Sequence, residues 1–148
     1  DKIVNSVARK VDDAIKGERH AVVFTVPRSE YPPEKLPEDF RASNQQRVAA
    51  ALQEVYNRIS VRPSVVIFKG GITSSTGLFG LGAKRVYVLG QIDQGIPVVK
   101  LLPQDNERSP GEEMLIIVGP GNVGVSETYV AIMNKLLGRE ESPSGSEF

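Results

Sequence analysis

The sequence contains no cysteine, a single histidine and no net charge, and each of these absences excludes a class of function. Without cysteine there are no disulfides, no thiolate metal sites and no cysteine nucleophiles, which suits a cytoplasmic protein. Lys and Arg together number 18, as do Asp and Glu, so no overall field steers the protein to nucleic acid or to a membrane surface. No apolar run approaches the ~20 residues of a membrane-spanning helix, and no signal peptide is visible. We therefore expect a cytoplasmic protein that binds neither nucleic acid nor membranes.

The length and composition are those of one globular domain with a short tail. A chain of 148 residues can bury a genuine core, and an apolar fraction of 40% is ordinary for such a domain. Residues 139–148 are polar and rich in glycine, serine and proline, which indicates a disordered tail or an expression remnant. The folded domain is therefore expected over residues 1–138.

Hydrophobic periodicity predicts helices and strands that alternate along the chain. The expected helices cover residues 3–15, a segment from a Ser43–Gln46 capping box to Ile59, and a segment capped by Ser126 that ends at Gly138. The expected strands are residues 21–26, 64–68, 85–89, 96–102 and 114–118, and the proline-rich residues 27–42 are expected to form a surface loop. This alternation is typical of an α/β fold, here a layered, Rossmann-like domain with a mostly parallel sheet flanked by helices. Because the chain opens on a helix where such folds open on a strand, we expect it to be a piece of a longer protein.

Two glycine-rich segments each follow a strand that is expected to be buried. The first, Gly70–Ser75 (GGITSS), follows residues 64–68, and the second, Gly119–Gly124 (GPGNVG), follows residues 114–118. Parallel strands deliver the loops at their carboxyl ends to one edge of the sheet. We therefore expect these two segments, which we call the glycine corners, to meet there. Glycine lets backbone N–H groups approach an anion, hydroxyls add donors, and a helix N-terminus favours negative charge. The pair predicts a phosphate cradle, although each loop alone is also compatible with a simple turn.

Other motifs and single residues carry weaker signals. Gly119–Gly124 matches the dinucleotide fingerprint G-x-G-x-x-G, but no further strand and no acidic residue ~20 positions on complete that motif. Lys69 can reach a phosphate or be a solvated strand end, and Asp93 suits a turn better than a water-mediated Mg²⁺ contact. Asp12 is expected on a solvated helix face, and His20 is expected to be a plain surface residue.

Three sequence blocks, taken together and in this order, indicate a family more specifically than any one of them alone. They are KGGITSS, LGAKRVYVLGQIDQGIPVVKL and IIVGPGNVG. Together they resemble the C-terminal nucleotide-binding domain of the four-carbon acid sugar kinase family, over roughly residues 2–138. The resemblance implies an ATP-dependent kinase, using Mg²⁺, that phosphorylates a hydroxyl of a sugar acid such as threonate, erythronate or a 3-oxo derivative. It also implies a partner, an N-terminal substrate-binding domain that supplies the acceptor site and the general base. The 148 residues of this chain alone would then not phosphorylate a sugar acid.

By motif, the resemblance assigns a small set of residues to the nucleotide, ATP or ADP: Gly70, Gly71, Ile72, Thr73, Ser74, Gly121 and Asn122. It assigns no catalytic residue and no metal ligand within this chain. Members of the family commonly have Asp where Thr76 stands and a bulky residue where Gly119 stands. A non-catalytic nucleotide-binding or interaction domain therefore stays open as an alternative, and a dinucleotide-dependent oxidoreductase is a weaker one.

Overall fold

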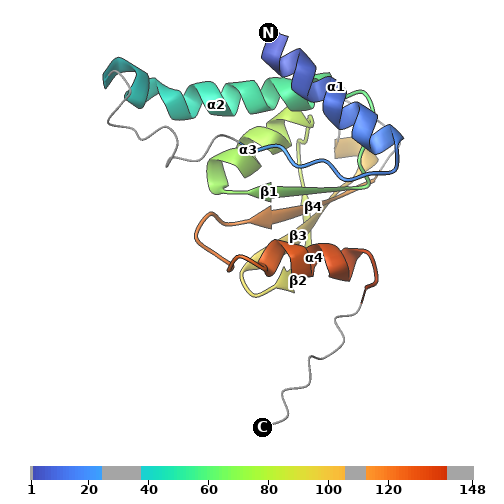
Figure 1. The fold of residues 1–148 in the computed structure, drawn as a ribbon. Coiled ribbons are helices and arrows are strands. Elements are labelled where there is room, and N and C mark those ends of the chain that lie inside the picture. The colour runs from blue at the N-terminus through green and yellow to red at the C-terminus, as the bar shows by residue number, and fades with distance from the viewer. Residues whose placement is uncertain (1, 25–37, 106–112, 140–148) are drawn as a thin grey trace.

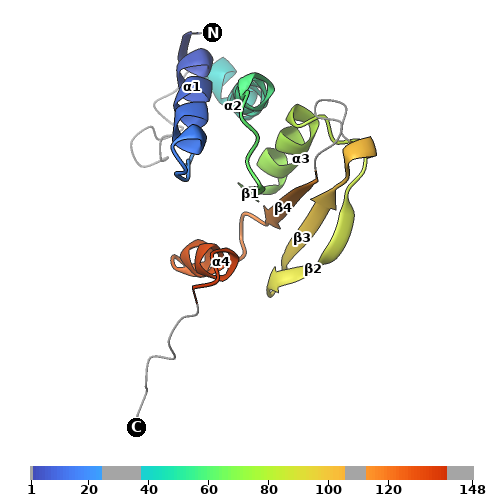
Figure 2. The ribbon, with the colours of Figure 1, turned by 90° about the vertical axis from the view of Figure 1, so that its right-hand side faces the viewer.

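Among the described residues, four strands form one sheet that carries helices on both faces (Figure 1). The computed structural model describes residues 2–24, 38–105 and 113–139, with the backbone alone for residues 38–45. The elements in chain order are α1 (Lys2–Lys16), α2 (Glu38–Arg58), β1 (Val65–Lys69), α3 (Gly71–Gly80), β2 (Tyr87–Asp93), β3 (Ile96–Leu101), the 3₁₀ turn η2 (Pro103–Asp105), β4 (Met114–Gly119) and α4 (Thr128–Leu136). Helix α3 lies against one face of the sheet, with α2 and then α1 stacked outside it, and α4 covers the opposite face (Figures 1 and 2).

The strand order is β1-β4-β3-β2, and of the described pairs only β1/β4 is parallel. Strands β2 and β3 are joined by a short turn at Gln94 and Gly95, where Gly95 has a φ of 73°. Asp93, the last residue of β2, accepts a hydrogen bond from the Gln94 N–H at 2.8 Å and so stabilises this turn, in line with the prediction from its position. Strands joined by so short a turn run antiparallel, because a parallel connection needs a dozen or more residues. The prediction of a mostly parallel sheet is therefore wrong, whereas the α/β class is confirmed.

Alternating side chains of β1 and β4 fill two apolar clusters, one on each face of the sheet. On the α3 face, Phe68 and Met114 are each 1% exposed and pack in one cluster. On the α4 face, Ile117 of β4 packs with Ile132 of α4, and both are fully buried. Burial on both faces explains why these strands appear in the sequence as continuous apolar runs.

Residues 21–24, expected as part of a strand, form none. The side chains of Val22 and Phe24 are 82% and 78% exposed, and no described strand pairs with this segment. β-branched residues favour a strand only where a neighbouring strand takes up the backbone hydrogen bonds. The remainder of this predicted strand, most of the predicted proline-rich loop and residues 140–148 of the predicted tail lie outside the described residues.

Two helix starts also differ from the predictions. Helix α2 begins at Glu38, so Ser43 lies inside it and is no N-cap. Helix α4 begins at Thr128, and its N-cap residue is Glu127, which makes no side-chain capping hydrogen bond, so the predicted Ser126 cap is wrong. Thr128 Oγ1 accepts a hydrogen bond from the Val125 N–H at 2.8 Å, which holds the turn before the helix. Within the part of the chain that the structure describes, no helix is both long and apolar enough to cross a bilayer.

Asp12 joins α1 to the segment that follows α2. Its carboxylate accepts hydrogen bonds from the Ser60 N–H at 2.9 Å, the Ser60 hydroxyl at 2.7 Å and the Val61 N–H at 2.9 Å. Burial raises the pKa of Asp12, but these hydrogen bonds together lower it more, so the pKa lies below its usual value. The prediction of a solvated residue is wrong for Asp12, while His20 is exposed as expected.

Candidate functional site

The glycine-rich segment after β1 forms helix α3, so the predicted loop over residues 70–75 is wrong. Only Gly70 precedes the helix, and its φ of 100° turns the chain out of β1 in a conformation that favours glycine. Ser74 donates from its N–H and from its hydroxyl to the Gly70 carbonyl, each at 2.8 Å. The Ser74 hydroxyl is therefore engaged within the first helical turn.

The two glycine corners lie side by side at one edge of the sheet, as predicted. In the parallel pair, Lys69 of β1 is opposite Gly119 of β4, so both strands end at the same place. The Gly70 N–H donates to the Gly119 carbonyl at 2.7 Å, and a Cβ at Gly121 would lie 3.7 Å from Gly70 Cα. The structure thus brings Gly70, Gly71 and Gly121 within reach of one ligand.

The N-terminus of α3 presents free donors at this corner. The N–H groups of Gly71, Ile72 and Thr73 have no acceptor within α3, because the first turn of a helix provides none. The positive end of the helix dipole lies at the same place. Both features favour an anion in front of Gly71.

Lys69 adds a full positive charge between the corners. Its Nζ donates to the Gly121 carbonyl at 3.2 Å and lies 5.2 Å from the centre of the Tyr129 ring. An ammonium over an aromatic face is stabilised by the ring quadrupole. Lys69 is therefore held beside Gly121, in a position from which its exposed ammonium can turn to an incoming anion.

The corner is also open to solvent. A Cβ at Gly71 would meet no atom within 4 Å, and Gly71, Gly121 and Asn122 are all exposed. Asn122 does not adopt the left-handed backbone and lies in a tight turn, in which the Val123 N–H donates to the Pro120 carbonyl at 3.4 Å. Open space, free N–H donors and a nearby lysine together suit a phosphate group.

A family model described as the nucleotide-binding C-terminal domain matches residues 1–129. The chain belongs to the nucleotide-binding C-terminal domain family. The match covers both glycine corners and ends in the first turn of α4. No curated protein and no solved structure matches the sequence. The C-terminal nucleotide-binding domain identified from the sequence motifs is thus confirmed.

In this nucleotide-binding domain, Gly119 makes room for an aromatic ring. A Cβ at Gly119 would overlap the Tyr129 hydroxyl and lie 3.0 Å from Tyr129 Cζ and 3.2 Å from the Phe68 carbonyl oxygen. The Tyr129 hydroxyl oxygen is buried without a hydrogen-bond partner among the described residues, and burial raises the pKa of Tyr129. Glycine at position 119, where the family that the sequence resembles commonly has a bulky residue, therefore lets Tyr129 pack against the end of β4 and beside Lys69.

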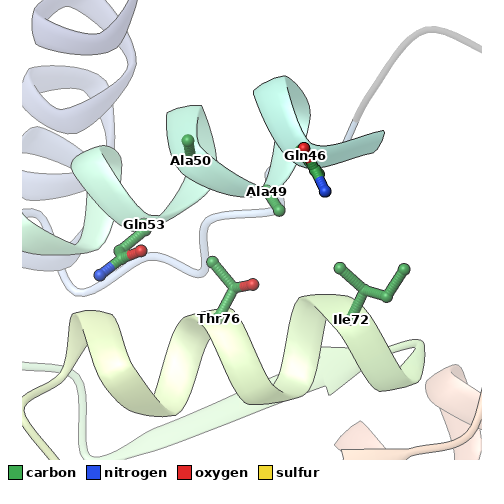
Figure 3. Close-up of a pocket in the computed structure, with 6 residues that line it drawn as sticks. All are labelled: Gln46, Ala49, Ala50, Gln53, Ile72 and Thr76. Atoms are coloured by element: carbon green, nitrogen blue, oxygen red, sulfur yellow. The ribbon is translucent and has the colours of Figure 1, made fainter. Parts of the chain in front are cut away.

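Thr76 lies away from the corner, on the side of α3 that faces α2. It lines a groove of about 440 Å³ between the two helices (Figure 3). The residues that line this groove are Gln46, Ala49, Ala50, Gln53, Ile72 and Thr76. A carboxylate in place of Thr76 would face α2 and not the glycine corner at Gly71. The position of Thr76 in the structure therefore weakens its value as evidence for the alternative of a non-catalytic domain.

Sequence reasoning missed this groove. Four of its lining residues, Gln46 to Gln53, are spaced i, i+3, i+4 and i+7, which places them on one face of α2. That spacing was visible in the sequence, but nothing local indicates that this face meets α3.

The dinucleotide fingerprint at Gly119–Gly124 lacks its required context. In that motif the glycine loop opens a helix directly. Here α4 begins only at Thr128, and two of the three described strand pairs in the sheet are antiparallel. The geometry therefore disfavours a dinucleotide-dependent oxidoreductase.

Proposed function

We propose that the corner formed by Gly70, Gly71 and Gly121 binds the phosphates of ATP. The observation that carries this proposal is the contact between the two glycine corners, in a chain whose family is nucleotide-binding. The N–H groups of Gly71 and Ile72 would hold phosphate oxygens, and the Thr73 hydroxyl would add a donor. Backbone donors at a helix N-terminus bind phosphate without a dedicated side chain.

We further propose that the chain is the ATP-binding half of a kinase for a four-carbon sugar acid. The ordered motifs around Gly70 and Gly121 support this proposal, as does the family of nucleotide-binding C-terminal domains. In the reaction, the bond between the γ-phosphorus and the β,γ-bridging oxygen breaks, and a new bond forms to the acceptor hydroxyl oxygen. ADP leaves, and the hydroxyl proton passes to a base in the N-terminal substrate-binding domain. Mg²⁺ would enter with the phosphates and neutralise part of their charge.

The residues of this chain contribute positioning and charge stabilisation, which supply most of the catalysis in phosphoryl transfer. The helix N-terminus at Gly71 and the Lys69 ammonium would stabilise the charge on the phosphates. The acceptor site and the base lie in the other domain under this proposal. We therefore expect the chain alone to bind ATP but not to phosphorylate threonate or erythronate, and turnover by the isolated chain would contradict the two-domain proposal.

The decisive variant is Gly71→Val, measured by calorimetric titration with ATP. The structure leaves room for a side chain at Gly71, so the fold should be retained while the new methyl groups occupy the place of a phosphate. Affinity for ATP should fall by at least about tenfold, equal to 1.4 kcal/mol. The matched control is Ser75→Val, a β-branched substitution on the exposed face of the same helix, which should leave affinity unchanged. Unchanged ATP affinity in a folded Gly71→Val protein would overturn the proposal.

A further inference from the structure

The groove between α2 and α3 begins where the phosphate corner ends. Ile72 belongs to both: its N–H lies in the free first turn of α3, and its side chain, in a residue that is 55% exposed, points toward α2 (Figure 3). Thr76 follows one turn later and points toward the same helix (Figure 3). From Gly71 to Thr76 the helix advances about 7.5 Å, at 1.5 Å per residue.

The groove exists because the two helices are close at one end of α3 and apart at the other. At the C-terminal end, a Cβ at Gly80 would lie 3.0 Å from Tyr56 Cβ and 3.3 Å from the Gln53 carbonyl oxygen. Glycine at position 80 lets α3 approach α2 this closely, because any side chain would press on these atoms. Toward the N-terminal end of α3, the small side chains of Ala49 and Ala50 leave the space unfilled.

The lining is apolar on its walls and polar at a few points. Ile72 and the two alanines supply hydrocarbon surface, and the lining residues carry no charge. The amides of Gln46 and Gln53 form no hydrogen bond within the described part of the chain. An amide offers a donor and an acceptor side by side, the pattern with which Gln recognises the N6 and N7 atoms of adenine. This chemistry suits a flat, uncharged heterocycle and not a phosphate.

We propose that this groove binds the adenine base of the nucleotide, with Ile72 and Ala49 against its faces and Gln53 at its polar edge. The inference rests on the proposed function, because it places the base of the same ATP molecule whose phosphates lie at Gly71. The ribose would span the interval along α3 between the corner and Thr76. Base binding here makes α2 part of the nucleotide site.

The test separates the base from the phosphates by titrating the full chain with ATP and with inorganic tripolyphosphate. Ala49→Leu fills the groove, and Gln53→Leu removes the amide at nearly constant size. Each variant should lower the affinity for ATP by at least about tenfold and leave that for tripolyphosphate unchanged. Ala51→Leu, on an exposed position of α2 outside the groove, is the matched control and should change neither affinity.

Inosine triphosphate tests the polar edge, because its base carries an oxygen where adenine carries the N6 amine. It should bind the wild-type chain more weakly than ATP, and Gln53→Leu should reduce this difference. Equal ATP affinities of the wild type and of both folded groove variants would overturn the inference but leave the phosphate corner intact. A parallel loss of ATP and tripolyphosphate affinity would also overturn it. Failure of the wild-type chain to bind either probe would instead contradict the proposed function itself.

Discussion

Helix α3 carries glycines at both ends, and the two ends lie in different surroundings. At the N-terminal end, a Cβ at Gly71 would have no atom within 4 Å. At the C-terminal end, a Cβ at Gly77 would overlap the Phe68 ring, and one at Gly80 would press on Tyr56 and Gln53. Glycine thus leaves open space at one end and lets α3 pack closely on the sheet and on α2 at the other. Glycine occurs at both ends, so its neighbours in the fold distinguish the two uses.

The second corner repeats this contrast within three residues. Gly119 is in contact with Tyr129, so its missing side chain is required by packing. Gly121 is exposed, and a Cβ there would lie 3.7 Å from Gly70 Cα, an ordinary contact distance. Substitutions at the packed and open glycines should therefore separate stability from ligand binding, and the following predictions test that separation.

The largest effect is expected for Gly77→Ala. Phe68 is 1% exposed and packs edge-to-face against Tyr56 with ring centres 5.3 Å apart, so its ring has little freedom to move away from a new methyl group. Overpacking of about 3 kcal/mol, less about 1 kcal/mol gained in helix propensity, gives a net loss of about 2 kcal/mol in the free energy of unfolding. Urea denaturation measures it. An unchanged midpoint would show that α3 is not packed tightly on the sheet.

The next largest effect is expected for Gly119→Ala, a loss of about 1.5 kcal/mol in the free energy of unfolding. The new Cβ forces the Tyr129 ring out of its place. The companion variant Tyr129→Phe removes the buried hydroxyl that the new Cβ would overlap. In a double-mutant cycle, Gly119→Ala should cost less in the Tyr129→Phe background, with a coupling of at least about 0.5 kcal/mol. Strict additivity of the two substitutions would show that Tyr129 is not the reason why position 119 requires glycine.

The contact of the two corners was predictable because it depends on only two buried strands. The continuous apolar runs that became β1 and β4 marked strands covered on both faces, and these two are indeed parallel neighbours. The rest of the sheet could be antiparallel without affecting this edge. The antiparallel β2/β3 pair was signalled by the short Gln94–Gly95 turn, but the alternation of helices and strands outweighed it in the prediction.

Helix α3 and the groove beside it were not predictable from local sequence. Gly, Ser and Thr all have low helix propensity, so the segment after β1 indicated a loop. Packing of α3 on Phe68 and on α2 decides otherwise, because tertiary contacts supply most of the stability of a short helix. The groove joins Gln46–Gln53 to Ile72 and Thr76, and no pattern within either segment specifies the other.

A smaller loss, about 1 kcal/mol, is expected for Gly80→Ala. The new Cβ would lie 3.0 Å from Tyr56 Cβ and 3.3 Å from the Gln53 carbonyl oxygen, both tighter than ordinary contact. Because the Gln53 side of this contact is backbone, α2 must shift as a unit. Overpacking of about 2 kcal/mol therefore exceeds the gain of about 1 kcal/mol in helix propensity. Thermal and urea unfolding should both place this variant between wild type and Gly77→Ala. A stability above wild type would show that the closed end of the groove is loosely packed.

The smallest effect is expected for Gly71→Ala, and its sign is opposite. Gly71 lies at the start of α3 without a positive φ, and the new methyl group would enter open space. Replacing glycine at a compatible helical position reduces the entropy of the unfolded chain, so the free energy of unfolding should rise by about 0.5 kcal/mol. Urea denaturation beside Gly77→Ala gives the direct comparison of an open and a packed glycine on one helix. A loss of stability at Gly71 comparable to that at Gly77 would show that both ends of α3 are closed by packing, and the corner would then have no room for a phosphate.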